Sequence, residues 1–328
     1  MNFEKYDGLK KLLEQKKCFK LICGAGNENL GEVEKLVALY SAAGCHFFDM
    51  CASEEVLKAA QRGLDFAIAK EEQKDYHFCI SVGTKNDPHM NKARINSEKC
   101  KRCEKCIRIC PQKAINSYFK VVEKNCIGCL KCKSVCNHGA IEIYQKNDRI
   151  EEILTPLLTS HSSQFTCIEL HASGQDELET EEKWEYLCQN FDGFLSLCIG
   201  RQNLSDAQIL ARIKRLVGKR KPYTTMIQAD GEPMSGGEDD YNTTLPAVMM
   251  AEIVQSADLP VYLLLSGGTN SKTAELARQH SVDFNGIAIG SYARKIVKEY
   301  IKRGDFLTNA EIFEEALKIA QRLIKSTE

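Results

Sequence analysis

The sequence has no long uninterrupted hydrophobic run and almost no net charge. Its N-terminal stretch, MNFEKYDGLKKLLEQKKCFKLICGAG, contains no apolar segment long enough for a signal peptide or a membrane-spanning helix. The chain carries 44 Lys and Arg residues against 45 Asp and Glu residues, which gives a formal net charge of -1. These totals indicate neither a nucleic-acid nor a membrane partner, and we expect a cytoplasmic, globular protein.

Signatures of several common enzyme classes are also missing. The glycine-rich, acidic loop ADGEPMSGGEDDYNTT (229–244) contains no set of residues for a Ser-His-Asp triad, a Walker loop or a zinc-protease helix. No lysine stands out in the sequence as a Schiff-base former. We expect this loop to act as a lid over a binding site, with Asp239 and Asp240 facing solvent.

Cysteine, by contrast, is abundant and concentrated. Of 16 cysteines, eight lie between Cys100 and Cys136. A chain of 328 residues can bury a core without an external staple, and it has no visible secretory signal. Metal ligation in a reducing compartment is therefore a better interpretation of these cysteines than disulfide bonding.

The eight cysteines form two ladders with the same spacing, C-x2-C-x2-C-x3-C, which is the bacterial ferredoxin pattern for a 4Fe-4S cluster. Pro111 follows the first ladder, whereas Asn137 follows the second. In this pattern the fourth cysteine of each ladder ligates the other cluster. We assign one cluster to Cys100, Cys103, Cys106 and Cys136, and the other to Cys126, Cys129, Cys132 and Cys110. A pair of zinc ribbons is the alternative, but its ligands come as separated pairs.

The segment that contains the ladders is basic. Residues 94–146 hold twelve Lys and Arg against four Asp and Glu, and the rest of the chain is acidic. Such a module could attract an acidic electron-transfer protein. The alternative is that the lysines only offset the negative charge of the clusters.

Outside this segment, short apolar runs alternate with amphipathic helical stretches, as in a parallel α/β fold. Eight runs with helices between them predict a (β/α)8 barrel, with an open doubly wound sheet as the alternative. The predicted domains are a first part of the barrel (1–93), a ferredoxin-like insert (94–146) and the rest of the barrel (147–328). The predicted strands lie within 19–26, 45–52, 77–83, 165–173, 193–200, 223–231, 260–268 and 285–291.

The insert follows the third predicted strand, so it should lie over the C-terminal mouth of the barrel, where active sites are built. The loops after the last two strands contain glycines and helix starts, as in phosphate-binding loops of barrels. They predict a site for flavin mononucleotide or another small phosphorylated ligand, with ordinary turns as the alternative. The candidate binding residues are Gly267, Gly268, Thr269, Gly290, Ser291 and Arg294.

Polar residues also occur inside the predicted strands. Glu169 and His171 are two positions apart, as are Gln228 and Asp230, so each pair shares a face of its strand. Glu169, His171 and Asp230 are the candidate catalytic residues, with His171 as a proton donor or, alternatively, a structural group. We interpret Cys23 and Cys51, on the first two strands, as small buried apolar residues.

The tandem ladders, together with QADGEPMSGG, LSGGTN and AIGSYARK, resemble the light-dependent period protein family (LdpA) over most of the chain. The resemblance implies an iron-sulfur protein that conveys cellular redox state, in cyanobacteria to the circadian clock machinery. Two hypotheses result. One is a redox sensor or electron-transfer protein with a signalling partner. The other is an oxidoreductase whose clusters pass electrons to a flavin or small phosphorylated ligand at the barrel mouth.

Overall fold

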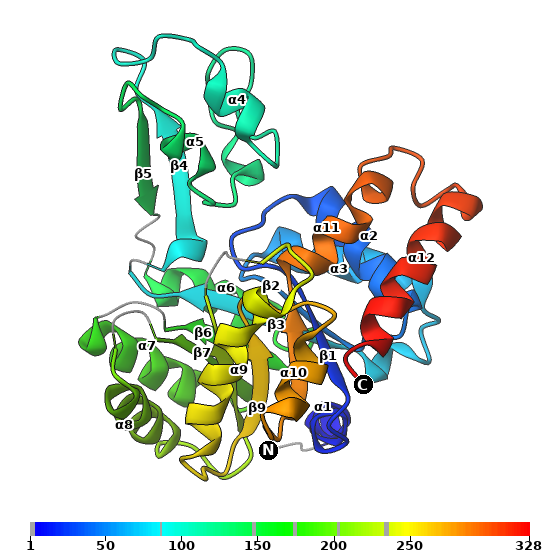
Figure 1. Cartoon of the computed structure of the whole chain (residues 1–328). Coiled ribbons are helices and arrows are strands. Elements are labelled where there is room, and N and C mark those ends of the chain that lie inside the picture. The colour runs from blue at the N-terminus through cyan, green and yellow to red at the C-terminus, as the bar shows by residue number, and fades with distance from the viewer. Residues whose placement is uncertain (1–3, 86, 146–148, 173–175, 202–203, 233–235) are drawn as a thin grey trace.

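The computed structural model describes residues 4–85, 87–145, 149–172, 176–201, 204–232 and 236–328. Eight parallel strands close into a barrel in the order β1-β10-β9-β8-β7-β6-β3-β2, with helices outside it (Figure 1). Closure through the β1–β10 and β1–β2 pairs confirms the predicted barrel and excludes the open sheet. The barrel strands are β1 (Cys18–Gly24), β2 (Phe47–Cys51), β3 (His77–Gly83), β6 (Cys167–His171), β7 (Phe194–Gly200), β8 (Thr225–Asp230), β9 (Tyr262–Ser266) and β10 (Gly286–Ile289).

Helices connect and cover these strands, and the main hydrophobic core lies between the two layers. Local sequence sets the helix starts. The helix α8, for example, begins in a capping box in which Ser205 and Gln208 exchange side-chain and backbone hydrogen bonds. The helices of the barrel are α1 (Glu4–Glu14), α2 (Leu30–Ala42), α3 (Glu54–Ala67), α6 (Ile150–Ser160), α7 (Glu177–Asn190), α8 (Asp206–Val217), α9 (Tyr241–Gln255), α10 (Thr273–Gln279), α11 (Ser291–Ile301) and α12 (Ala310–Lys325).

The N-terminal end of the barrel is closed and apolar. Leu9 and Leu13 of α1 are fully buried against inward-facing side chains of the strands, including Phe47 and Leu264. Any site that admits a ligand to the barrel interior therefore faces the other end, where the strands finish.

Between β3 and β6 the chain leaves the barrel and forms a small second body beyond the carboxyl ends of the strands (Figure 1). Its base is an antiparallel pair, β4 (Asn91–Ile95) with β5 (Ile141–Gln145), whose register runs from Asn91–Gln145 to Ile95–Ile141. The two ladders lie between these strands and include the short helices α4 (Lys105–Ile109) and α5 (Lys131–Ser134). We call residues 91–145 the insert.

Cys23 and Cys51 are buried in the main core, as expected. Part of the predicted lid loop, residues 233–235, lies outside the described residues. Among the residues that the structure describes, no helix has the length and apolar character needed to cross a membrane.

Candidate functional site: two cysteine ladders above a polar barrel mouth

Cysteines from both ladders surround one small cavity in the insert. Cys126, Cys129 and Cys132 of the second ladder line a cavity of about 20 Å³, and Cys110 of the first ladder lines the same cavity. Burial and, to a smaller extent, the neighbouring thiols of Cys129, Cys126 and Cys110 together raise the pKa of the Cys132 thiol to about 11. Four thiols gathered around one small cavity fit a site that takes up cationic metal.

Of the other four cysteines, the three of the first ladder lie near one another. Burial raises the pKa of Cys106, with further contributions from Cys100 and Cys103. Cys136 packs against the same small hydrophobic cluster of the insert that contains Cys106. Asn96 links the segments that follow Cys136 and precede Cys103, because its backbone N–H donates to Ala140 O at 2.8 Å and its carbonyl accepts from Cys100 N at 3.1 Å.

Cys136 differs from these cysteines in its ionisation. Burial alone would raise the pKa of its thiol, but backbone N–H groups of residues 138–141 lower it overall. Hydrogen bonds from N–H groups to a thiolate sulfur are one of the main determinants of the reduction potential of an iron-sulfur cluster.

The backbones of the two ladders repeat as closely as their sequences. Arg102 and Gly128, which occupy equivalent positions, have left-handed φ angles of 52° and 68°. Glu104 and Leu130, also equivalent, have φ angles of 61° and 60°. Three non-glycine residues in this sparsely populated region indicate a backbone shaped by a functional requirement. The donor set and this backbone fit iron-sulfur clusters, whose irons the cysteine thiolates would ligate.

Two lysines and a glutamine join the second-ladder cavity to the barrel. The buried Lys92 ammonium donates to Cys126 O at 2.9 Å and to Gly26 O, in the loop after β1, at 3.0 Å. Lys298 of α11 donates to Pro111 O at 2.7 Å. Gln112 donates to Glu32 of α2 at 3.3 Å. The cavity that Cys110 lines is therefore attached to three segments of the barrel, namely the loop after β1, α2 and α11.

Inside the barrel, a layer of polar side chains lies above the apolar plug. The fully buried Lys20 ammonium lies 2.6 Å from Asp49 Oδ2 and 2.6 Å from Glu169 Oε2. Burial alone would lower the pKa of Lys20, but these carboxylates raise it well above its usual value. Lys20 is therefore held in its charged form, as an ammonium that pairs with the two carboxylates.

His171 lies one layer higher and connects this network to the mouth. Its Nε2 is 3.0 Å from Glu169 Oε1, and its Nδ1 is 3.7 Å from Asp87 Oδ2. Burial alone would lower the pKa of His171, but the bond to Glu169 and the charge of Asp87 raise it to about 9. A protonated imidazole at neutral pH can donate a proton or hold an anion.

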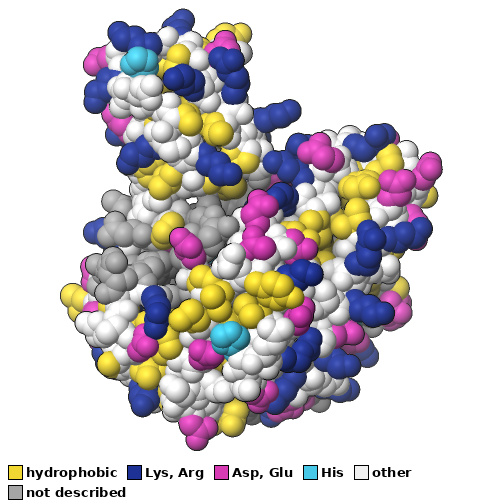
Figure 2. All heavy atoms as spheres, in the orientation of Figure 1, with side chains coloured by type: hydrophobic (Ala, Val, Ile, Leu, Met, Phe, Trp, Pro, Cys, Tyr) yellow, Lys and Arg dark blue, Asp and Glu magenta, His cyan; other side chains and the backbone are white. Residues whose placement is uncertain are grey.

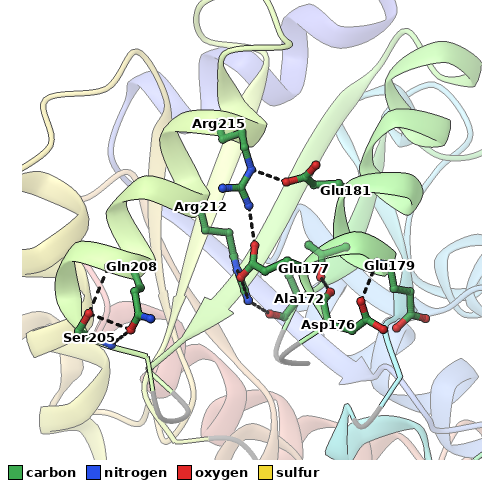
Figure 3. A network of polar contacts seen from close by, with 10 residues as sticks. Ala172, Asp176, Glu177, Glu179, Glu181, Ser205, Gln208, Arg212 and Arg215 are labelled. Atoms are coloured by element: carbon green, nitrogen blue, oxygen red, sulfur yellow. Dashed lines mark hydrogen bonds and ion pairs between the residues drawn. The ribbon is translucent and has the colours of Figure 1, made fainter.

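The end of β6 is fixed by an arginine that is only 2% exposed, Arg212 of α8 (Figure 3). Its Nη1 donates to Ala172 O, next to His171, at 3.1 Å. Its Nε donates to Glu177 Oε1 at 2.7 Å, and Arg215 also pairs with Glu177. This network holds the strand end, and with it His171, against α7 and α8.

The structure brings most of the predicted ligand-binding and catalytic residues to one cavity of about 70 Å³ at the mouth. All six predicted binding residues, Gly267, Gly268, Thr269, Gly290, Ser291 and Arg294, line it, together with His171 and Asp230. Glu169 does not line it, because it lies in the layer below and binds Lys20 and His171. The α11 helix begins at Ser291, so its first N–H groups lie at this cavity.

The conformation of the loop after β9 has a structural cause as well. Gly267 and Gly268 have φ angles of 72° and 81°. A Cβ on Gly267 would lie 2.0 Å from Asp230 Oδ1, so only glycine fits beside that carboxylate. The glycine pair is thus required by its neighbour on β8, independently of any ligand.

Sequence reasoning missed Lys20, Asp87 and Lys92. The one available signal for Lys20 was its position within the apolar run of β1. Because side chains alternate between the two faces of a strand, that position points into the barrel. Asp87 and Lys92 follow β3 in a polar stretch, and nothing in that stretch distinguishes them from solvent-exposed residues. Their burial, at 0% and 3% exposure, depends on the insert packing over the barrel.

The fold and the ladders define a class, namely an α/β-barrel protein with a cysteine-rich, iron-sulfur-binding insert after its third barrel strand. The family model for the light dependent period A C-terminal domain matches residues 159–326, and the model for the LdpA Fe-S cluster-binding domain matches residues 90–147. The chain belongs to the light dependent period A family, and its cofactor is of the iron-sulfur type.

A curated relative, "Light dependent period A" of Synechococcus elongatus, is 29% identical over 294 residues, which cover 87% of this chain and 82% of the relative. Similar solved structures include tryptophan synthase from M. tuberculosis, with a TM-score of 0.46, 9% identity and coverage of 98% and 96% of the two chains. The YdjI aldolase from Escherichia coli K12 has a TM-score of 0.42, 12% identity and coverage of 97% and 94%. The fold assignment rests on the closed barrel itself.

Proposed function

We propose that this chain is a redox protein with two 4Fe-4S clusters, which carries electrons and reports cellular redox state. The observation that carries the proposal is the position of Cys110, which lines one cavity with Cys126, Cys129 and Cys132. That set has the crossed composition expected of a two-cluster ferredoxin module. Clusters of this kind accept and release single electrons, and a reducing compartment such as the cytoplasm suits their thiolate ligands.

A sensor role is supported by the contacts between the insert and the barrel. Reduction would add negative charge close to Cys126, whose carbonyl accepts a hydrogen bond from Lys92. Lys92 also binds Gly26 O and pairs with Glu28 at 3.4 Å, and both residues lie in the loop between β1 and α2. A change of charge in the insert would therefore alter the contacts of Lys92 with the loop between β1 and α2, and a signalling partner could bind to that loop.

The cluster content tests the proposal. Protein purified without oxygen should contain about eight irons and eight sulfides per chain. Reduction should give the paramagnetic signal of two interacting 4Fe-4S clusters in electron paramagnetic resonance. A colourless, zinc-loaded protein, or a stoichiometry of about four irons, would contradict the proposal.

A second candidate is an oxidoreductase in which the clusters exchange electrons with a flavin or small phosphorylated ligand. It is favoured by the mouth cavity, where Arg294, Ser291 and the start of α11 meet the protonated His171. In this function Arg294 and the N–H groups would hold the phosphate, and His171 would donate a proton to the reduced ligand. A stoichiometric yellow chromophore released on denaturation would support this candidate over a pure sensor.

A further inference from the structure

Two cavities of unequal size meet at the barrel mouth. The mouth cavity has a volume of about 70 Å³, and a second cavity of about 620 Å³ lies between the second ladder and helices α2 and α11. Figure 2 shows the molecular surface hollowed between the insert and the barrel. Both cavities are lined by Gly24, Ala25, Gly236, Ser291 and Arg294. They therefore form one continuous site with a narrow end and a wide end, which we call the interdomain site.

The two volumes suit different parts of a ligand. A water molecule occupies about 30 Å³ of liquid, so the narrow end holds a group no larger than a phosphate. Pockets that take cofactors and drug-sized ligands have about 300 to 1,000 Å³. The wide end falls in that range, whereas a complete flavin or nucleotide cannot fit in the narrow end alone.

The charged residues that line the wide end are mainly basic. Six basic residues face two acidic residues, Glu32 and Glu238. Some of the cations have partners within the protein, since Lys295 pairs with Glu238 at 2.8 Å and Lys298 binds Pro111 O. The surplus of positive charge nevertheless favours an anionic ligand. The basic residues are Lys35, Lys131, Arg294, Lys295, Lys298 and Lys302.

Arg294 lies at the junction of the two ends. A Cβ added to Gly24 would lie 3.3 Å from its Nη1, so the guanidinium lies along the loop after β1. Its Nε is 3.5 Å from Gly290 O, next to the start of α11. A planar guanidinium in this position can bind a phosphate held by the α11 N–H groups. On the opposite wall of the wide end lie Ile127 and Cys129 of the second ladder.

We propose that the interdomain site binds a phosphorylated ligand of nucleotide size, with its phosphate in the narrow end and its body in the wide end beside Cys129. This inference rests on the second candidate function, and it adds that the ligand bridges the barrel mouth and the second ladder. The mouth cavity alone would take only a small oxyanion, so the insert supplies the part of the site that recognises the rest of the ligand.

Titration of the anaerobically purified, iron-loaded protein with flavin mononucleotide, riboflavin and inorganic phosphate tests this inference. Flavin fluorescence quenching and calorimetry measure the binding. We expect flavin mononucleotide to bind at least about tenfold more tightly than riboflavin, because only the former has a phosphate for Arg294. Inorganic phosphate should compete with flavin mononucleotide.

Two variants separate the ends of the site. Arg294→Met should weaken the binding of flavin mononucleotide about tenfold or more and leave the affinity for riboflavin unchanged. The exposed Arg303→Met is the control and should change neither affinity. Gly31→Trp places a large side chain at the wall of the wide end, where an added Cβ meets only Asn29 Oδ1 at 3.8 Å. It should abolish binding of the flavin and spare that of phosphate. Gly304→Trp, whose Cβ meets no atom within 4 Å, is its control.

The outcomes distinguish this inference from the cluster proposal. Binding of phosphate but no flavin mononucleotide would overturn it, and so would equal flavin affinity in Gly31→Trp and the parent protein. Unchanged affinity in Arg294→Met would also overturn it. Iron and sulfide contents measured on the same samples report the clusters separately, so a full complement of iron with no nucleotide binding would leave the two-cluster proposal standing.

Discussion

The two ladders are nearly identical in sequence spacing and backbone, but their surroundings differ. Around the first ladder, Lys101, Arg102 and Cys103 are all exposed, and Arg108 contacts Cys103 O, at 3.4 Å, and the nearby Glu104. The cavity of the second ladder is instead tied to the barrel by Lys92 and Lys298. The start of the first ladder thus faces solvent, whereas the second-ladder cavity, which includes Cys110, faces the barrel. This gives the tandem module an outer and an inner end.

The largest expected effect concerns the crossed ligation that joins these ends. Cys110→Ser should remove the cluster of the inner end and Cys136→Ser that of the outer end, so that each variant retains about four irons. Iron analysis and electron paramagnetic resonance of the reduced variants measure this.

Double variants test whether the ligation is crossed. Cys110→Ser combined with Cys129→Ser should lose no more iron than Cys110→Ser alone, because both cysteines belong to one cluster. Cys110→Ser combined with Cys103→Ser should lose both clusters. The reverse pattern would show that each ladder holds its own cluster.

A smaller effect is expected from the equivalent positions Gly128 and Arg102. Both have left-handed φ angles, but a Cβ on Gly128 would lie 2.4 Å from Asn91 O, at the base of the insert. Gly128→Ala should therefore lower the free energy of unfolding by about 2 kcal/mol or more. Arg102→Ala, at an exposed position that already bears a Cβ, should change it by less than about 0.5 kcal/mol.

Anaerobic denaturant unfolding, followed by circular dichroism and by cluster absorbance, measures both variants. Equal losses at the two positions would mean that the repeats have equivalent surroundings, which would remove the structural basis for an inner and an outer end.

The sequence predicted what depends on local chemistry. Cysteine spacing identified the ladders, and apolar runs identified all eight barrel strands, because each of these signals lies within a few residues of chain. The close approach of Gly128 to Asn91 O, by contrast, involves a strand that lies 37 positions earlier.

Long-range packing could not be predicted in the same way. Lys20 meets Glu169 across the barrel, between residues 149 positions apart, so only strand order and register bring them together. The different surroundings of the two ladders were also invisible, since the residues that tie the second-ladder cavity to the barrel lie in β4, α2 and α11. The candidate mouth residues were accessible to sequence reasoning because loops after the last two strands of a barrel always share one end.

Lys92 should affect only the inner cluster. Its ammonium stabilises added negative charge, so Lys92→Met should lower the reduction potential of the cluster that Cys126 ligates. Removing a unit charge that lies several ångströms from a cluster, in a partly buried setting, should shift its reduction potential by an amount on the order of 50 to 100 mV.

Anaerobic redox titration with electron paramagnetic resonance resolves the two clusters. The exposed Lys120→Met is the control and should shift neither potential. Equal shifts of both clusters in Lys92→Met would contradict an inner position for Cys126.

The smallest effect is expected at the outer end, where an acidic electron-transfer protein would dock. Lys101→Glu with Arg102→Glu should slow reduction of the protein by a photoreduced acidic ferredoxin several-fold at low ionic strength, because attraction between opposite charges raises association rates. Raising the salt concentration to about 0.5 M should remove most of the difference, since exposed charges are then screened. The matched change at the inner end, Lys131→Glu with Lys133→Glu, should have less effect if electrons enter through the first ladder. Stopped-flow absorbance measures these rates, and a larger effect of the inner pair would reverse the assigned direction of electron entry while preserving the difference between the two ends.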